Sequence, residues 1–161
     1  SQPGGALGID SAADGVGAEL AALLSVKDAQ ARERGIALSV AATGTVPSEM
    51  SADLITVVGN LVDNAFDACG AEDRVGVVIA AGAVAVAVTV DDTGPGVPEH
   101  LNEKIFDEGV STKGSTARAR GIGLALVRRV VRRRRGSVVL SASPSGGARF
   151  TVTLPISGES S

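Results

Sequence analysis

The stretch that decides the fold is NLVDNAFDA, residues 60–68. Its apolar residues continue a helical stripe that begins upstream, so it belongs to an amphipathic helix. Asn60 and Asn64 stand four residues apart and project from one side of that helix. Asp63 and Asp67 share this spacing. Because Asn is a poor helix former, the two amides are either solvated surface residues or ligands, and an amide oxygen suits Mg²⁺ beside phosphate oxygens.

Periodicity and turn residues divide the chain on either side of this helix. We predict a linker at 1–15, helices at 16–34, 47–69 and 121–135, strands at 36–42, 74–80, 83–90, 137–143 and 148–154, and a flexible tail at 156–161, leaving one domain at 16–155. Gly35 and Gly70 mark helix ends, and the two central strands are expected to pair antiparallel. Helices and strands are segregated more than they alternate. This pattern predicts an α+β fold, with about three helices on one face of a mixed sheet of about five strands.

The amino-acid composition narrows the range of possible functions. The chain has 161 residues, 44% of them hydrophobic, which suits one compact domain. Aromatic residues make up 2%, so binding of nucleic acid by base stacking is not expected. The single Cys69 excludes an internal disulfide, and the single His100 excludes a cluster of histidine metal ligands. The longest apolar run, about 75–90, is interrupted by glycines and too short for a membrane helix, so we expect no membrane contact by this segment.

Two glycine-containing stretches follow the central strands. In VTVDDTGPGVPEH, residues 88–100, Asp92 stands at a strand end before Gly94 and Gly96, which allow a flat ligand to approach the backbone. An ordinary Asp/Gly/Pro turn is the alternative. In ARARGIGLALVRRVV, residues 117–131, the glycines precede an apolar helix whose N-terminus can hold phosphate. No Walker motif occurs, and no strand–helix–strand unit supports a Rossmann fold.

Together with IFDEGVSTKG, residues 105–114, these stretches form four motifs in a fixed order. In that order the chain resembles the ATP-binding catalytic domain of sensor histidine kinases, in the superfamily that also holds gyrase, MutL-type repair proteins and anti-sigma-factor kinases. NLVDNAFDA resembles the asparagine box, DDTGPGVP and RGIGLALV the two glycine boxes, and IFDEGVSTK the phenylalanine box. Three stretches are most similar to the citrate- and dicarboxylate-sensing subfamily: VVGNLVDNAFDA at 57–68, FDEGVSTKG at 106–114 and the upstream KDAQARERGIAL at 27–38.

The resemblance implies a Bergerat-type two-layer α/β sandwich with a mostly antiparallel sheet, and ATP and Mg²⁺ as the bound nucleotide and metal. It implies that Asn64 holds Mg²⁺, that Asn60 lies beside the phosphates, and that Asp92 accepts a hydrogen bond from the adenine amino group. Asn60 and Lys113 are the expected catalytic residues. A mobile lid is expected between Phe106 and Gly121. The implied nucleotide contacts are Asn60, Asn64, Asp67, Asp92, Gly94, Gly96, Phe106, Thr112, Lys113, Gly121, Gly123 and Leu124, with Arg118 or Arg120 as further candidates.

Asn60 distinguishes between branches of this superfamily. The ATP-hydrolysing members carry Glu at that position, because a carboxylate can take a proton from water and an amide cannot. Asn60 therefore favours transfer to a protein histidine. His100 lacks a helical histidine-box context and is expected to be a surface residue, so the acceptor would lie on a separate dimerisation domain of the same kinase, with a response regulator downstream and a cytoplasmic location. A non-transferring ATP-sensing module and a serine kinase or ATPase of the superfamily remain the alternatives.

Six arginines lie between Arg128 and Arg135. Such a run is typical either of a nucleic-acid patch or of cations that complement the dipole at a helix C-terminus. No aromatic residues are interleaved, and the whole chain carries a net charge of −3. We therefore expect a solvated or partner-facing surface and no specific nucleic-acid partner.

Overall fold

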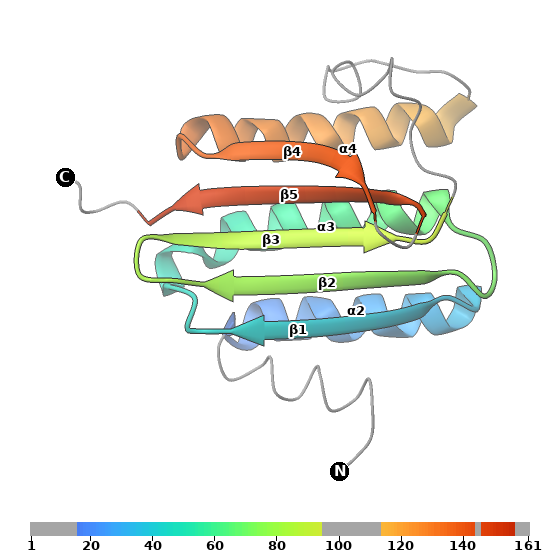
Figure 1. Ribbon diagram of the computed structural model, residues 1–161, viewed down its shortest axis with the longest axis horizontal. Helices are drawn as coiled ribbons and strands as arrows, with labels where there is room; N and C mark the ends of the chain where they lie inside the picture. The colour runs from blue at the N-terminus through green and yellow to red at the C-terminus, as the bar shows by residue number, and fades with distance from the viewer. Residues whose placement is uncertain (1–15, 95–113, 144–145, 157–161) are drawn as a thin grey trace, which may run out of the picture.

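The chain forms a five-stranded sheet with its helices on one face (Figure 1). The computed structural model describes residues 16–94, 114–143 and 146–156, and gives residues 114–122 as helical backbone only. The elements are α2 (Ala18–Arg34), β1 (Ala37–Thr43), the 3₁₀ turn η1 (Ser48–Met50), α3 (Ser51–Ala68), β2 (Arg74–Ala81), β3 (Ala85–Asp92), α4 (Gly114–Arg133), β4 (Ser137–Ala142) and β5 (Ala148–Pro155).

The strand order is β1-β2-β3-β5-β4. Only the β1–β2 pair is parallel, whereas β2–β3, β3–β5 and β4–β5 are antiparallel. The predicted two-layer α+β sandwich is therefore confirmed, including the antiparallel pairing of the two central strands. The expected linker at 1–15 and residues 157–161 of the expected tail lie outside the described residues.

Helix α3 lies behind the middle of the sheet, with α2 on one side and α4 on the other (Figure 1). Its apolar stripe is fully buried, at Leu54, Val57, Val58, Leu61 and Val62. The strand residues that face it alternate with more exposed ones, as in β3, where every second residue is buried. One core therefore fills the space between the helices and the sheet, and α3 is the helix at its centre.

The two glycines predicted to end helices behave differently. Gly35 ends α2 in the left-handed conformation, with φ at 74°, and its amide and the next one bond back to the last turn, so this prediction is confirmed. Gly70 is not such a cap. Helix α3 ends at Cys69 in an extended conformation, and the Gly70 amide instead donates to Asp73 Oδ2 at 2.7 Å. The chain must turn straight into β2, and an extended exit with an Asp-anchored turn achieves that.

The predicted start of the last helix is wrong. Helix α4 begins at Gly114, seven residues before Gly121, so part of the segment expected as a lid is helical. The sequence GSTARAR offers Ala and Arg, which are strong helix formers, and an apolar stripe appears only after it. Gly121 and Gly123 consequently lie inside the helix, at a cost of about 1 kcal/mol each relative to Ala, and not at a free N-terminus.

The sheet face that points away from the helices carries mainly small residues. It exposes two larger apolar side chains, Val78 and Val139, which are 46% and 54% accessible. Arg149 pairs there with Asp91 across the β3–β5 register. Over the part of the chain that the structure describes, no helix combines the length and the apolar character needed to cross a membrane.

Part of the arginine run holds two helices together. Arg134 Nε donates to Asp53 Oδ2 at 2.5 Å, and Arg133 also pairs with this carboxylate. Arg134 in addition donates to the Glu49 carbonyl at 3.2 Å. Burial of Asp53 acts to raise its pKa, but the hydrogen bonds from Arg134 and Arg133 outweigh that effect and hold the pKa below the ordinary 3.8. The C-terminus of α4 is thereby fixed to the N-terminus of α3.

We expect Asp53→Asn to reduce the free energy of unfolding at pH 7 by about 1–2 kcal/mol, because both arginines lose their charged partner. A lowered carboxyl pKa contributes stability above the unfolded value, and that contribution is lost as the pH falls through the folded value. The difference between wild type and variant should therefore shrink below about pH 4. Urea titrations at pH 7 and pH 3 measure it. A control, Asp28→Asn, removes a single pair within α2 whose arginine is 73% exposed, and should change stability less. An Asp53→Asn difference that is equal at both pH values would contradict the assignment.

Candidate functional site

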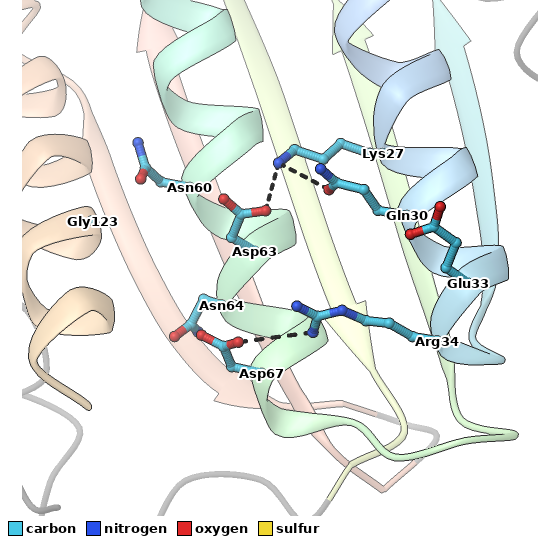
Figure 2. A pocket seen from close by; sticks show the side chains of 9 residues that line it. All are labelled: Lys27, Gln30, Glu33, Arg34, Asn60, Asp63, Asn64, Asp67 and Gly123. Atoms are coloured by element: carbon cyan, nitrogen blue, oxygen red, sulfur yellow. Dashed lines mark hydrogen bonds and ion pairs between the residues drawn. The ribbon is translucent and has the colours of Figure 1, made fainter. Parts of the chain in front are cut away.

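A cavity of about 510 Å³ crosses the outer face of α3 (Figure 2). Helix α2 forms one of its walls, and α4 contributes Gly123 from the other side. Its lining is almost entirely polar and consists of Lys27, Gln30, Glu33, Arg34, Asn60, Asp63, Asn64, Asp67 and Gly123. Both asparagines of the NLVDNAFDA stretch are thus brought into one cavity.

The two asparagines have different environments. Asn60 Nδ2 donates to the Thr56 carbonyl at 2.7 Å, one helical turn earlier, which leaves its oxygen as the available acceptor. Asn64 is 7% exposed, and its Oδ1 has no hydrogen-bond partner among the described residues. An unsatisfied buried acceptor is rare in a folded protein. The Asn64 amide is therefore not a solvated surface group, and its oxygen is suited to accept a ligand, whereas Asn60 is partly buried.

Gly123 brings α4 close to Asn60. A Cβ atom at this position would lie 2.8 Å from Asn60 Oδ1, closer than real Cβ contacts allow. Leu124, the next residue, is fully buried in the core and anchors the helix there. A side chain at this position would displace the Asn60 amide, so the glycine serves the close contact between two helices rather than a phosphate-binding helix N-terminus.

Asp92 occupies the end of β3 and is 3% exposed. Its Oδ1 accepts hydrogen bonds from the amides of Gly94 at 2.9 Å and Ala148 at 3.4 Å. Burial raises the Asp92 pKa above its ordinary value and outweighs the lowering effect of those two bonds. Burial and the nearby Asp92 charge likewise raise the pKa of the Cys69 thiol to about 11, so the thiol stays protonated at neutral pH. The carboxylate is held rigidly in a low-dielectric setting.

Two glycines make room for this carboxylate and for the end of α3. A Cβ at Gly94 would lie 2.5 Å from the Ala68 carbonyl, and one at Gly147 would lie 2.3 Å from Asp92 Oδ1. The Asp92 turn therefore adjoins the last residue of α3, whereas the cavity lies over residues 60–67 of the same helix. Both halves of the candidate site are arranged along one helix.

The structure brings together seven of the predicted contacts. Asn60, Asn64, Asp67 and Gly123 line the cavity, Asp92 and Gly94 form the turn, and Leu124 packs behind Gly123. Gly121 is placed only as backbone of α4. The predictions for Gly96, His100, Phe106, Thr112 and Lys113, and for the side chains of Arg118 and Arg120, lie outside the described residues.

Sequence reasoning missed the α2 wall. Lys27, Gln30 and Arg34 stand at i, i+3 and i+7 and therefore share one helix face, which is a polar stripe that periodicity could have indicated. It missed Gly147 as well. That glycine follows the PSGG turn, and only the pairing of β5 beside β3 shows that it abuts Asp92.

A family model, described as "Histidine kinase-, DNA gyrase B-, and HSP90-like ATPase", matches residues 49–158. The chain belongs to this family. The matched region contains α3, the Asp92 turn and α4, which supply all seven predicted contacts described above. It begins after α2 and so does not include the α2 wall of the cavity.

Known relatives and a solved structure agree with this assignment. The chain is 36% identical over 152 residues to "Sensor protein CitS" of Halalkalibacterium halodurans, covering 84% of this chain and 26% of that protein. It is 36% identical over 155 residues to "Sensor histidine kinase DcuS" of Escherichia coli (strain K12), covering 88% of this chain and 27% of that protein. The catalytic domain of histidine kinase ThkA superposes with a TM-score of 0.71 at 23% identity, over 84% of this chain and 90% of that one.

These findings confirm the predicted family resemblance and fold. The fold is that of a histidine kinase catalytic domain, and the CitS and DcuS relatives are named as sensors. The chain spans about a quarter of the length of those two relatives. Activity, substrate and partners of the whole protein are therefore matters for proposal and experiment.

The contact between Gly123 and Asn60 can be tested with a matched pair of helix glycines. A Cβ added at Gly59 would make only ordinary contacts, the nearest being Leu23 Cδ2 at 3.7 Å, so Gly59→Ala should raise the free energy of unfolding by about 0.5–1 kcal/mol. Gly123→Ala should gain less or destabilise, because Asn60 must leave the Thr56 carbonyl. Urea unfolding measures both, and equal gains would show that Asn60 yields without cost.

Proposed function

We propose that this chain binds Mg-ATP and transfers the γ-phosphoryl group to a histidine on a separate domain of the same sensor kinase. One observation carries the proposal: the buried Asn64 oxygen lines the cavity and lacks a partner among the described residues. Leaving such an acceptor unsatisfied costs about 1–3 kcal/mol. Binding of a ligand by this amide would offset that cost.

The cavity and its surroundings fit Mg-ATP. Asn64 offers a hard oxygen to Mg²⁺, which usually keeps waters and phosphate oxygens as its other ligands. Among the residues that the structure describes, no group of three or more His, Cys, Asp or Glu side chains could hold a metal, and a site completed by phosphates does not need one. Mg²⁺ supplies positive charge against the triphosphate. Asn60 and Asp67 would lie beside it.

The Asp92 turn fits the base. A rigid carboxylate offers acceptors only, which suits the exocyclic amino group of adenine and opposes the carbonyl of guanine. Gly94 and Gly147 let the backbone pack closely against Asp92 and the end of α3, which fixes where this carboxylate lies. We therefore assign adenine to the C-terminal end of α3 and the phosphates to the cavity over its middle.

Asn60 supports transfer over hydrolysis. Its amide cannot act as a base, and its donor is already engaged by Thr56. In the proposed reaction the bond between the γ-phosphorus and the β–γ bridging oxygen breaks, a bond to the acceptor imidazole nitrogen forms, and ADP leaves. Lys113, the second expected catalytic residue, remains a prediction, together with Gly96, Phe106, Thr112 and the proposed lid.

The ATPase alternative rests on one observation. Glu33, Asp63 and Asp67 line the cavity, and a carboxylate can serve as a base. However, Asp63 is engaged by Lys27 at 2.5 Å, and Arg34 lies 3.9 Å from Asp67. Both carboxylates therefore already have a cation partner, and the position that carries Glu in the hydrolysing members is an amide here, which favours phosphotransfer. A module that senses ATP without transfer would bind the nucleotide but form neither phosphohistidine nor free phosphate.

The relatives suggest the cellular setting. A sensor kinase related to CitS and DcuS would carry a sensing region, a dimerising region with the acceptor histidine, and a response regulator as the next partner. We propose a cytoplasmic location for this part of the protein, and no specific nucleic-acid partner.

The reaction can be tested by reconstitution. With radiolabelled ATP, the chain alone should bind nucleotide without labelling itself and should release little phosphate. Addition of a purified acceptor domain from a CitS- or DcuS-like kinase should give acid-labile, base-stable phosphohistidine. Steady phosphate release by the chain alone would favour the ATPase, and binding without label on any acceptor tested would favour the sensing module.

Removal of the Asn64 amide should weaken Mg-ATP binding by about 10- to 100-fold while the fold persists, because the apolar face of α3 is untouched. Calorimetric titration of Asn64→Ala measures the affinity, and circular dichroism verifies the fold. Without Mg²⁺ the affinities of the wild type and the variant for ATP should differ far less. A loss that is equal with and without Mg²⁺ would assign Asn64 to the nucleotide itself.

A further inference from the structure

The α2 wall meets α3 through two ion pairs (Figure 2). Lys27 Nζ lies 2.5 Å from Asp63 Oδ1 and donates to Gln30 Oε1 at 3.4 Å. Further along α2, Arg34 Nη1 lies 3.9 Å from Asp67 Oδ1, and its guanidinium lies over the Phe66 ring. Each carboxylate that α3 presents beside its asparagines therefore has a cation from α2.

The Lys27–Asp63 pair is unusual in its burial. The Lys27 side chain is 9% exposed, whereas the Asp63 side chain is 56% exposed. A largely buried ammonium requires a partner, and Asp63 at 2.5 Å supplies it. The Arg34–Asp67 pair is longer, and Arg34 is 51% exposed. Lys27 is thus the fixed cation of this wall, and Arg34 the adjustable one.

The charged residues that line the cavity explain why a cation fixed beside Asp63 is needed. The lining residues include two cations, Lys27 and Arg34, and three carboxylates, Glu33, Asp63 and Asp67. One of these carboxylates, Asp63, directly precedes Asn64 in the chain. An unpaired carboxylate in the same cavity would repel a polyphosphate, with an energy that rises as the local dielectric constant falls.

We propose that Lys27 is a positioning residue for the nucleotide phosphates: it neutralises Asp63, so that the Asn60–Asn64 side of α3 can accept a polyphosphate. This inference rests on the function proposed above. Lys27 acts through Asp63 and need not touch the ligand. The matched family region starts after α2, so the role is assigned from the contacts of this chain.

A double-mutant cycle separates this role from the alternatives. Lys27→Met, Asp63→Asn and the double variant are titrated by calorimetry with Mg-ATP, Mg-ADP and AMP, and their unfolding is measured in urea. Lys27→Met should weaken Mg-ATP about tenfold, Mg-ADP less and AMP little, because the repulsion follows phosphate charge. The double variant should regain affinity to within about threefold of wild type, since the repelling charge is gone. Arg32→Met, which removes the pair of an exposed α2 cation with Asp28, neither of which lines the cavity, is the matched control.

Three outcomes would overturn the proposal. If Lys27→Met and the double variant lose affinity equally, Lys27 binds the phosphates directly. If all folded variants bind alike and differ only in unfolding, the pair is purely structural. If AMP is weakened as much as ATP, the loss is not electrostatic. Should Lys27→Met not fold, Lys27→Gln replaces it in the cycle. Failure of the wild type itself to bind ATP would count against the proposed function instead.

Discussion

Helix α3 has to be apolar towards the sheet and polar towards a cavity over the same 18 residues. Its buried stripe fixes its rotation, because any turn about its axis would expose Leu54, Leu61 or their neighbours. Once that rotation is set, Asn60 and Asn64 can only lie on the flank that faces the cavity. The core therefore determines the direction of the two amides, and their placement needs no loop.

Close approach between elements completes the site. Gly123 allows α4 to reach Asn60, Gly94 allows the Asp92 turn to reach the end of α3, and Gly147 allows β5 to reach Asp92 itself. In each case the nearest atom to an added Cβ would be a polar oxygen at 2.8 Å or less. These glycines are required by tertiary contacts with the site, and they come from three separate parts of the chain.

Sequence reasoning succeeded where the signal is local. Helical spacing placed Asn60 and Asn64 on one flank, and the strand before Asp92 placed that carboxylate at a strand end. It failed where contacts between distant parts of the chain decide the structure, and where helix propensity outweighs the pattern of glycines. The glycines before Leu124 indicated a helix start, but Ala and Arg upstream extend α4 back to Gly114. The α2 stripe is visible in the sequence, but its pairing with α3 depends on how two helices far apart in the chain pack together.

The negative charge of α3 explains why neighbouring segments, α2 among them, place cations beside it. Its sequence SADLITVVGNLVDNAFDA contains three aspartates and no cation, and Asp67 lies in the last turn, where the helix dipole disfavours an anion. Each aspartate is met by a cation from a neighbouring segment: Asp53 from the C-terminal end of α4, and Asp63 and Asp67 from α2. Without these partners the helix would present anionic charge along the flank that carries its amides. Ion pairs that fix the helices in place therefore also set the charge along that flank, and the proposed binding of phosphates there depends on that charge.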